Sequence, residues 1–350
     1  MELSTPGRIC LFGEHQDYLG LPVIPMAISL RARFIGENRS DRKFLINKPD
    51  LNEVDSFSLD DLTYTKPRDY FKSGVRVCLN EGLTFSNGFE CELTSEIPMQ
   101  AGTGSSSAIT VSWIHFLSQM ADKPADWDQR KIGSLAYTAE VVEFNEPGGM
   151  MDQYSTALGD LIYIESKPEI SIQTMNPNLG YFVLGDSCEP KDTMGILHRC
   201  RDSRLAIAEK IKSQDPDFSL HEIELDETSQ YNLHTDEATL LSGTIQNRDL
   251  LRQALPELKK AEPDHEKIGR LLSEHHTVLR DVLDVSTPKI EMMLEAAMDA
   301  GALGGKINGS GGGGCMFAYA PDNPGKVTKA IKKAGGKAYT IHPDMGTRID

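Results

Sequence analysis

Residues 7–18 read Gly7-Arg8-Ile9-Cys10-Leu11-Phe12-Gly13-Glu14-His15-Gln16-Asp17-Tyr18. The apolar run Ile9–Phe12 predicts a strand, and the residues from Glu14 to Tyr18 all carry ionisable or hydrogen-bonding side chains. A strand end with clustered donors and acceptors is suited to recognising several sugar hydroxyls. A polar turn with solvated side chains explains the same residues equally well, so this segment alone leaves both interpretations open.

The composition is that of a globular chain with an acidic charge balance. Its 350 residues, 39% of them hydrophobic, fit one large or two medium domains. The 36 Lys and Arg residues against 52 Asp and Glu residues give a formal net charge of −16. A field of that sign repels nucleic-acid backbones and anionic lipid surfaces, so we expect no nucleic-acid partner and no membrane partner. A small anionic ligand can still bind to local amide dipoles.

Cysteine usage and the first residues favour a cytoplasmic protein. The six cysteines include no C-x-x-C pair, so we expect reduced thiols rather than a disulfide framework. Met1–Ser4 lacks the basic and apolar regions that open a secretory signal peptide. We therefore expect a cytoplasmic location.

Hydrophobic spacing predicts an irregular mixture of strands and helices. Strands are expected over 9–12, 23–30, 89–93, 181–184, 304–308, 315–320 and 337–342. Helices are expected over 105–120, 131–144, 194–212 and 326–334, with helical spacing also dominating 237–300. Strands in both halves of the chain favour an α+β fold over a doubly wound parallel sheet, with a domain boundary near 160–180.

A segment of small residues leads directly into the helix expected at residue 105. It reads Pro98-Met99-Gln100-Ala101-Gly102-Thr103-Gly104-Ser105-Ser106-Ser107-Ala108. Small residues let backbone N–H groups approach a phosphate, the helix N-terminus adds a favourable dipole, and serine hydroxyls can ligate Mg²⁺. The alternative is a flexible connection whose serines only cap the helix. The immediate helix start favours phosphate binding, although the G-x-x-x-x-G-K-[ST] motif is absent.

A third segment places an aspartate behind a glycine turn. Asp152 follows Gly148-Gly149-Met150-Met151, where a carboxylate could act as a buried base. Taken alone, a capping or turn role explains such an aspartate better.

A fourth segment, Lys306-Ile307-Asn308-Gly309-Ser310-Gly311-Gly312-Gly313-Gly314-Cys315, contains G-x-G-x-x-G. A strand rather than a helix is expected after it, and no ribose-binding acid follows about 20 residues on, which excludes a dinucleotide-binding motif. The glycines allow close packing against a ligand loop or simply a flexible turn, and both remain open.

In this order the four segments resemble the three signature motifs and the catalytic aspartate of the GHMP small-molecule kinases. Within that superfamily they are most similar to galactokinases. Gly7–Tyr18 matches the pattern G-R-x-N-[LIV]-x-G-E-H-x-D-Y except for Cys10, where Asn is usual. Asp69–Val75 resembles Y-x-K-G-V with Ser73 as an extra residue, and Gly149–Gln153 resembles G-I-M-D-Q.

The resemblance implies a fold and an activity. The fold is the two-domain α+β GHMP kinase fold, with a ribosomal-S5-like N-terminal domain over 1–170 and a ferredoxin-like C-terminal domain over 171–350. The activity is ATP- and Mg²⁺-dependent phosphorylation of a monosaccharide, galactose or a relative, at its anomeric hydroxyl.

The resemblance also implies roles for individual residues. Asp152 would be the catalytic base or transition-state carboxylate, with Arg8 as its cationic partner. The residues that fall where the family contacts sugar hydroxyls are Glu14, His15, Asp17 and Gly149. The phosphate loop would be Gly102, Thr103, Gly104, Ser105, Ser106 and Ser107. Mg²⁺ would be held by Ser106 and Glu140.

Departures from the galactokinase pattern leave the sugar open. Leu19-Gly20-Leu21 stands where Asn-x-Gly is usual, and a substrate-contacting Tyr expected after the central strand has no counterpart near His198-Arg199. A heptose kinase or a kinase of a carboxylated (uronic-acid) sugar is therefore an alternative, whereas the Glu14-to-Tyr18 cluster speaks against mevalonate. A non-catalytic sensor of sugar and ATP is a further alternative, which retention of Arg8, Glu140 and Asp152 disfavours.

Overall fold

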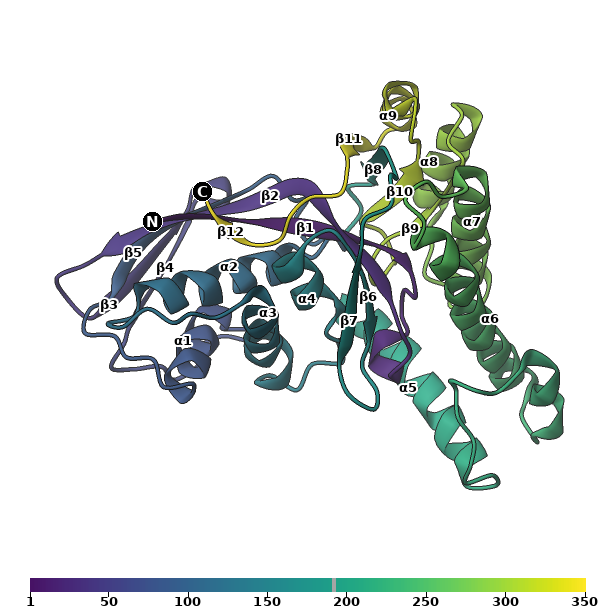
Figure 1. Ribbon diagram of the computed structural model, residues 1–350, viewed down its shortest axis with the longest axis horizontal. Helices are drawn as coiled ribbons and strands as arrows, with labels where there is room; N and C mark the ends of the chain where they lie inside the picture. The colour runs from purple at the N-terminus through teal and green to yellow at the C-terminus, as the bar shows by residue number, and fades with distance from the viewer. Residues whose placement is uncertain (191–192) are drawn as a thin grey trace.

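The computed structural model describes residues 1–190 and 193–350. Within these residues the strands form two sheets with helices packed against them (Figure 1). No helix in the described part of the chain is long and apolar enough to cross a membrane. The mixture of both element types confirms the α+β expectation.

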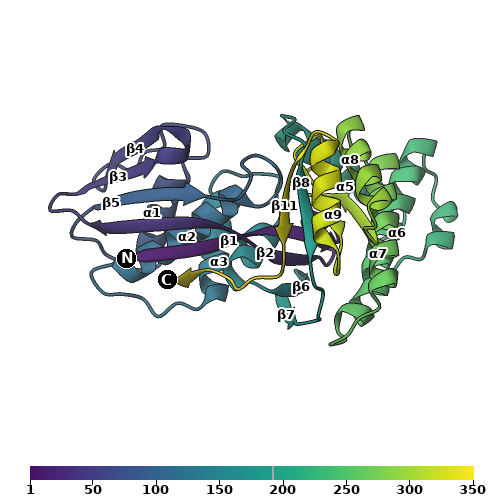
Figure 2. The ribbon, with the colours of Figure 1, turned by 90° about the horizontal axis from the view of Figure 1, so that it is seen from above.

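The first sheet has eight strands in the described residues. They are β1 (Glu2–Phe12), β2 (Ile24–Asn38), β3 (Lys43–Lys48), β4 (Glu53–Ser58), β5 (Phe89–Ser95), β6 (Leu161–Glu165), β7 (Ser171–Met175) and β12 (Arg348–Ile349). The main path runs β12-β1-β2-β5-β3-β4, with β6 beside β2 and β7 beside β6. The neighbours are antiparallel except β3 and β5, which are parallel. Pairing of β12 with β1 brings the C-terminus beside the N-terminus (Figure 2).

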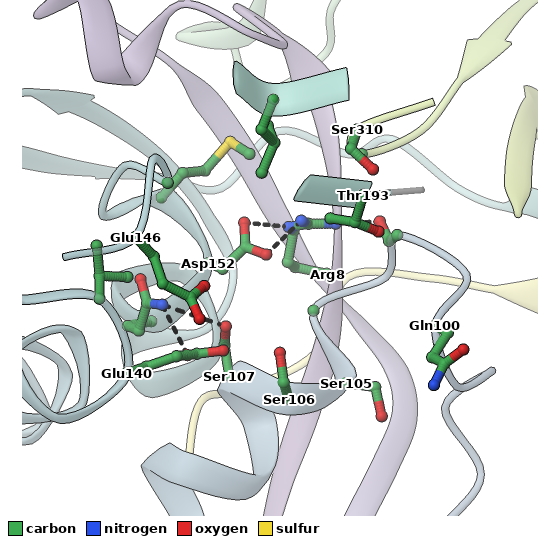
Figure 3. Close-up of a pocket in the computed structure, with 18 of the residues that line it drawn as sticks. Arg8, Gln100, Ser105, Ser106, Ser107, Glu140, Glu146, Asp152, Thr193 and Ser310 are labelled. Atoms are coloured by element: carbon green, nitrogen blue, oxygen red, sulfur yellow. Dashed lines mark hydrogen bonds and ion pairs between the residues drawn. The ribbon is translucent and has the colours of Figure 1, made fainter. Parts of the chain in front are cut away.

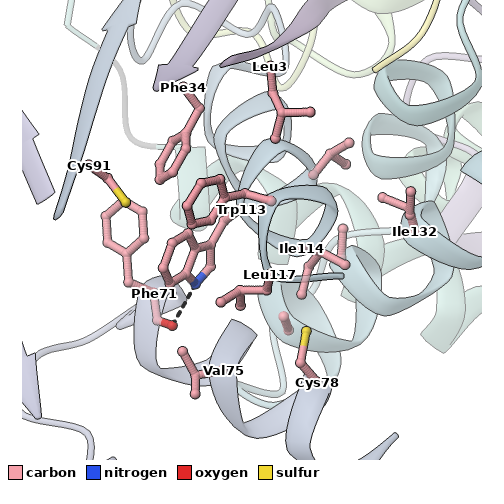
Figure 4. Close-up of a cluster of buried hydrophobic side chains, with 14 of the residues drawn as sticks. Leu3, Phe34, Phe71, Val75, Cys78, Cys91, Trp113, Ile114, Leu117 and Ile132 are labelled. Atoms are coloured by element: carbon pink, nitrogen blue, oxygen red, sulfur yellow. Dashed lines mark hydrogen bonds between the residues drawn. The ribbon is translucent and has the colours of Figure 1, made fainter. Parts of the chain in front are cut away.

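The helices of the N-terminal half lie on one side of this sheet: α1 (Tyr70–Asn80), α2 (Ser105–Met120), α3 (Gln129–Tyr137) and α4 (Met151–Leu158). Trp113 of α2 lies at the centre of the aromatic core between helices and strands (Figure 4). Its ring centroid is 5.4 Å from that of Phe34 on β2 and 5.6 Å from that of Phe71 on α1. The indole Nε1 donates to the Phe71 carbonyl oxygen at 2.8 Å. This packing fixes α2, and with it the small-residue segment that leads into its N-terminus.

The second sheet has four antiparallel strands in the described residues, in the order β11-β8-β10-β9. Their bounds are β8 (Phe182–Asp186), β9 (Gly304–Ile307), β10 (Cys315–Tyr319) and β11 (Lys337–Ile341). Side chains alternate between its faces, as the strand period requires. Val183 and Met316 pack with α8 (Pro288–Asp299) and α9 (Pro324–Lys333), whereas Phe182 and Phe317 pack with residues of β1 and β2. The two sheets therefore share a core.

The remaining helices belong to the C-terminal half: α5 (Thr193–Lys212), α6 (Thr235–Leu258) and α7 (His265–Asp281). Short 3₁₀ turns are η1 (Asp17–Leu19), η2 (Pro49–Leu51) and η4 (Leu225–Gln230). α7 lies along β9 and beside α6 (Figures 1 and 2).

Several expected elements differ from the observed ones. The helix expected over 131–144 ends at Tyr137 and continues as a π-helical turn, η3 (Thr138–Val142). The region 237–300 is three helices, because Asp264 and Thr287 accept backbone N–H bonds as N-caps and start new ones. Helices α1 and α4 and the β3–β4 hairpin were not expected.

The sheets do not divide at residue 170. β7 follows that position but pairs with β6, and β12 at the end of the chain pairs with β1. The division into 1–170 and 171–350 therefore describes the two sheets only approximately.

Candidate active site

A cleft of about 1000 Å³ lies where β1, the start of α2 and the glycine hairpin between β9 and β10 meet. Its lining includes all but one of the residues expected to form the site: Arg8, Glu14, His15, Asp17, Gly102, Gly104, Ser105, Ser106, Ser107, Glu140, Gly149 and Asp152. The expected residues, up to 144 positions apart in the sequence, thus meet around one cavity. Thr103 is the exception among the expected residues.

Arg8 and Asp152 form a two-pronged ion pair inside the cleft (Figure 3). Arg8 Nε donates to Asp152 Oδ1 at 2.7 Å, and Arg8 Nη2 donates to Asp152 Oδ2. Burial lowers the pKa of Arg8, but the charges of Asp152 and Glu14 and the hydrogen bond to Asp152 together outweigh this effect and raise the pKa above its usual value, so the guanidinium stays charged. The Asp152 side chain is 27% exposed and that of Arg8 only 5%, so the carboxylate faces the cleft with the cation behind it.

The segment before α2 is a tight loop built around two glycines in the left-handed conformation. Gly102 and Gly104 have φ angles of 82° and 70°, which other residues rarely adopt. A Cβ on Gly104 would lie 3.0 Å from Arg8 Cγ, so the loop lies directly against the arginine. Ser105, Ser106 and Ser107 form the first turn of α2, where backbone N–H groups lack helical partners.

Thr103 has a different place from the one expected. Its hydroxyl donates to the Pro98 carbonyl oxygen at 3.1 Å, and its own carbonyl accepts from the Arg8 backbone N–H at 2.9 Å. The side chain is buried within the loop. Thr103 therefore holds the loop to β1 instead of lining the cleft.

The glycine hairpin packs directly against this loop, which settles the alternatives left open by its sequence. A Cβ on Gly309 would lie 2.6 Å from the Gly102 carbonyl oxygen, and one on Gly314 would lie 2.7 Å from that of Ala101. The Cys315 N–H donates to the same Ala101 oxygen at 2.8 Å. The glycines permit close backbone contact, and the segment is not merely a flexible turn.

Glu140 lies in the π-helical turn η3, buried beside the start of α2. Gln153 Nε2 donates to Glu140 Oε2 at 2.7 Å and to Ser107 Oγ at 3.3 Å. Burial raises the pKa of Glu140, and hydrogen bonds from Ser106, Gln153 and Ser107 oppose that shift. A π-helical turn inside a helix is often found at functional sites.

The oxygen atoms of Glu140 and Ser106 fit a hard cation such as Mg²⁺. Figure 3 shows both residues below the Arg8–Asp152 pair. Among the described residues, no group of three or more His, Cys, Asp and Glu side chains could hold a metal ion by itself. Phosphate oxygens of a nucleotide would supply the other ligands, as is usual for Mg²⁺.

Asp17 and Gly149 lie in contact with each other in the lining of the cleft. The Asp17 carboxylate accepts from the backbone N–H of Tyr18 at 2.9 Å and from that of Met151, at the start of α4, at 3.4 Å. A Cβ on Gly149 would lie 1.9 Å from Asp17 Oδ2, so only glycine fits there. Burial, with a smaller effect from the charge of Asp152, raises the pKa of Asp17 to about 6.

Glu14 and His15 are each held by the C-terminal half. Lys306 of β9 donates to Glu14 Oε2 at 2.8 Å, and both side chains are buried. His15 has a φ of 63°, and its ring lies between Tyr18 Oη at 2.8 Å and the Ser310 carbonyl oxygen at 3.0 Å. Arg204 of α5 in turn donates to Tyr18 Oη at 2.5 Å. The polar turn after β1 is therefore an ordered part of the interface between the sheets.

Some residues of the site had not been assigned a role from the sequence. Lys306 and Asn308 belong to the glycine segment, and the signal in the sequence was a lysine within an expected strand that is otherwise without charge. Arg68 and Glu146 also line the cleft and pair at 2.6 Å. They lie in two loops, and hydrophobic periodicity does not predict that these loops come together.

Comparison with known families agrees with this geometry. The model described as GHMP kinases N terminal domain matches residues 69–160, and that described as GHMP kinases C terminal matches 252–337. The galactokinase galactose-binding signature matches residues 3–37, which contain Arg8, Glu14 and Asp17.

Relatives of both mevalonate kinase and galactokinase type align along nearly the whole chain. The mevalonate kinase of Thermococcus onnurineus (strain NA1) is 30% identical over 358 residues, covering 99% of this chain and 97% of the relative. The galactokinase of Actinobacillus succinogenes (strain ATCC 55618 / DSM 22257 / CCUG 43843 / 130Z) is 25% identical over 342 residues, covering 95% and 88%.

The crystal structure of Lactococcus lactis galactokinase complexed with galactose superposes with a TM-score of 0.85 at 21% identity, covering 99% of this chain and 94% of that one. This likeness shows the two-domain GHMP kinase fold. With both domain models matched and a relative aligned from end to end, the chain belongs to the GHMP kinases, a family of ATP-dependent phosphotransferases.

Proposed function

We propose that the protein transfers the γ-phosphoryl group of ATP to the anomeric hydroxyl of an uncharged monosaccharide, galactose or a relative. The observation that carries the proposal is the cleft itself. Asp152, oriented by Arg8, faces the same cavity as the first turn of α2 and the polar residues Glu14 and Asp17. Phosphoryl transfer needs this combination of an anion-binding loop and an oriented carboxylate.

In the proposed mechanism the backbone N–H groups of Gly102 and of residues 104–107 bind the phosphates. Arg8 holds Asp152 so that its carboxylate meets the acceptor hydroxyl, either to accept the proton or to orient the oxygen for attack on phosphorus. Asp17 and Glu14 accept hydrogen bonds from other hydroxyls of the sugar. A bound Mg²⁺, for which Ser106 and Glu140 are the candidate ligands, would neutralise charge on the phosphate oxygens.

The charges of the cleft favour an uncharged acceptor. Among the described residues that line it, the two arginines are Arg8 and Arg68, and each is paired with a carboxylate, Asp152 and Glu146 respectively. A carboxylated acceptor would need one of these cations or would face Asp17 and Asp152. An uncharged polyol meets neither difficulty, which supports a neutral sugar over a uronic acid.

A mevalonate-type acceptor is the second candidate. The identity of 30% to a mevalonate kinase over nearly the whole chain favours it. The galactose-binding signature over residues 3–37 and the pairing of the cleft arginines favour the sugar.

A coupled assay of ADP release across a panel of acceptors tests the proposal. The panel contains galactose, other neutral hexoses, a heptose, galacturonate and mevalonate, and ³¹P NMR of the product locates the phosphoryl group. We expect turnover of a neutral sugar and a product phosphorylated at the anomeric oxygen. Turnover of mevalonate alone, or binding of sugar and ATP without ADP release, would overturn it.

The variant Asp152→Asn tests the assigned carboxylate in the same assay. We expect kcat to fall about 10²–10⁴-fold, because a neutral amide can neither accept the proton nor align the hydroxyl as an anion does. Unchanged turnover would exclude Asp152 from the chemistry.

A further inference from the structure

Lys306 is a fully buried lysine whose ammonium group has three protein acceptors. Its Nζ donates to the Cys10 carbonyl oxygen at 2.9 Å, to Glu14 Oε2 at 2.8 Å and to the Ile307 carbonyl oxygen at 2.8 Å. An ammonium has three N–H donors, so these contacts fix its direction. One oxygen of Glu14 is thereby occupied, and the orientation of the other is set.

Asn308, two residues further on, is also fully buried and reaches the phosphate loop. Its Nδ2 donates to the Gly102 carbonyl oxygen at 2.7 Å, and its Oδ1 accepts from the Cys10 N–H at 2.9 Å. The same Gly102 oxygen accepts from Arg8 Nη1. Asn308 therefore contacts the loop at the point where the loop contacts the arginine of the reacting pair.

The two side chains use the two backbone groups of a single residue of β1. Lys306 binds the carbonyl oxygen of Cys10, and Asn308 binds its N–H. The register partner of Cys10 on β2 is Pro25, which has no N–H to offer that carbonyl. Because alternate residues of an extended segment point to one face, Lys306 in β9 and Asn308, the residue directly after β9, both reach β1.

We propose that Lys306 and Asn308 are positioning residues that set the two halves of the site separately. Lys306 fixes the orientation of the Glu14 carboxylate and so determines the affinity for the acceptor. Asn308 fixes the position of the Gly102 carbonyl and so determines the affinity for the nucleotide and its alignment for transfer. The first role rests on the proposed function, because Glu14 is assigned to the acceptor. The second needs only the phosphate loop.

A structural role alone would predict a different result. Removing either side chain would then weaken the contact between the sheets and change affinity for both substrates together. A positioning role predicts that the two variants separate, each changing one substrate constant and leaving the other within about two-fold.

The acceptor role is tested by a double-mutant cycle between Lys306→Met and Glu14→Gln. We expect Lys306→Met to raise the acceptor KM about ten-fold or more with little effect on affinity for ATP. Added to Glu14→Gln, the same change should alter the acceptor KM less than about two-fold, because the group it positions is already altered. Since Lys306→Met leaves a buried carboxylate without its partner, that variant can fail to fold, and the comparison of Glu14→Gln with the double variant then decides. A further ten-fold rise in the double variant would overturn the role.

The nucleotide role is tested by Asn308→Ala with a non-hydrolysable ATP analogue, whose binding is measured by calorimetry without any acceptor. We expect the Kd of the analogue to rise about ten-fold and kcat to fall, with the acceptor KM within about two-fold. Wild-type affinity for the analogue would overturn it, as would an equal rise in both substrate constants.

Ile307→Val is the matched control, because Ile307 lies between the two residues but packs in the hydrophobic cluster with α8. It should lower thermal stability and leave both substrate constants unchanged. Failure of every acceptor in the panel would count against the proposed function, whereas unchanged analogue binding by Asn308→Ala would count against the positioning role alone.

Discussion

Asp17 is the residue whose ionisation gives the site a pH dependence. Its carboxyl has a pKa of about 6 because it is buried and lies near Asp152. It is therefore mostly ionised at pH 7 and mostly protonated at pH 5. In the proposed function, protonation removes the charge that strengthens hydrogen bonds from the acceptor's hydroxyls.

The acceptor KM should rise about ten-fold between pH 7 and pH 5 if only the ionised Asp17 binds the sugar, since a pKa of about 6 leaves about one tenth ionised at pH 5. The measurement is the acceptor KM across this range for wild type and Asp17→Asn. The variant should have a raised KM that no longer changes with pH. A wild-type KM that stays constant, or a variant that keeps the wild-type profile, would contradict the assignment.

The sequence predicted the residue types at the site and the pairing of Arg8 with Asp152, but not the partner of Glu14. Arg8, Glu14, Asp17 and Asp152 stand in motifs whose residue types reveal polar chemistry. Lys306 was not predictable as the partner of Glu14, because the two are 292 positions apart and only the docking of β9 on β1 brings them together.

At the scale of elements, the hydrophobic spacing predicted a helix or strand correctly where a single periodicity runs through the whole element. The helix expected over 105–120 matches α2 (Ser105–Met120), because its apolar spacing and small-residue start agree. The segment 131–144 was predicted as a plain helix, yet it changes to a π-helical turn that places Glu140 in the cleft. Such a turn keeps helical dihedrals and composition, so the sequence offers no periodic signal for it.

The packing of the glycine hairpin on the phosphate loop gives a prediction with a matched control. Gly309 and Gly301 both have left-handed φ angles, of 75° and 96°. A Cβ on Gly309 would meet the Gly102 carbonyl oxygen, whereas one on Gly301 would have nothing within 4 Å. Alanine at either position should lower stability by about 1 kcal/mol through backbone strain.

Only Gly309→Ala should also push the hairpin away from the loop and raise the Kd of an ATP analogue, by about ten-fold. Calorimetric titration and thermal unfolding of both variants separate the two effects. Equal analogue affinity in Gly309→Ala and Gly301→Ala would show that the close contact does not shape the nucleotide site.

At the scale of the whole molecule, the chain first forms the second sheet and then adds its last strand, β12, to the first sheet. Arg31 of β2 holds the returning segment in place. It donates to Asp344 Oδ2 and to the Met345 carbonyl oxygen at 2.9 Å each, and to the Gly346 carbonyl oxygen at 2.8 Å. It also donates to Ser4 Oγ on β1 at 2.9 Å. Long-range closure of this kind leaves no local pattern, which explains why the sequence predicted a domain boundary but not the return of β12.

Arg31→Met should therefore destabilise the fold by about 3 kcal/mol, because several largely buried hydrogen bonds of one guanidinium are lost and Asp344 loses the nearer of its two ion-pair partners in the described residues. Arg33→Met is the control on the same strand: Arg33 is 62% exposed and lies 3.4 Å from Glu2, so its loss should change stability by less than about 0.5 kcal/mol. Neither arginine lines the cleft, so substrate constants of both folded variants should match the wild type. Denaturant unfolding measures the difference between them. Equal midpoints would mean that the C-terminal return adds little to the stability of the first sheet.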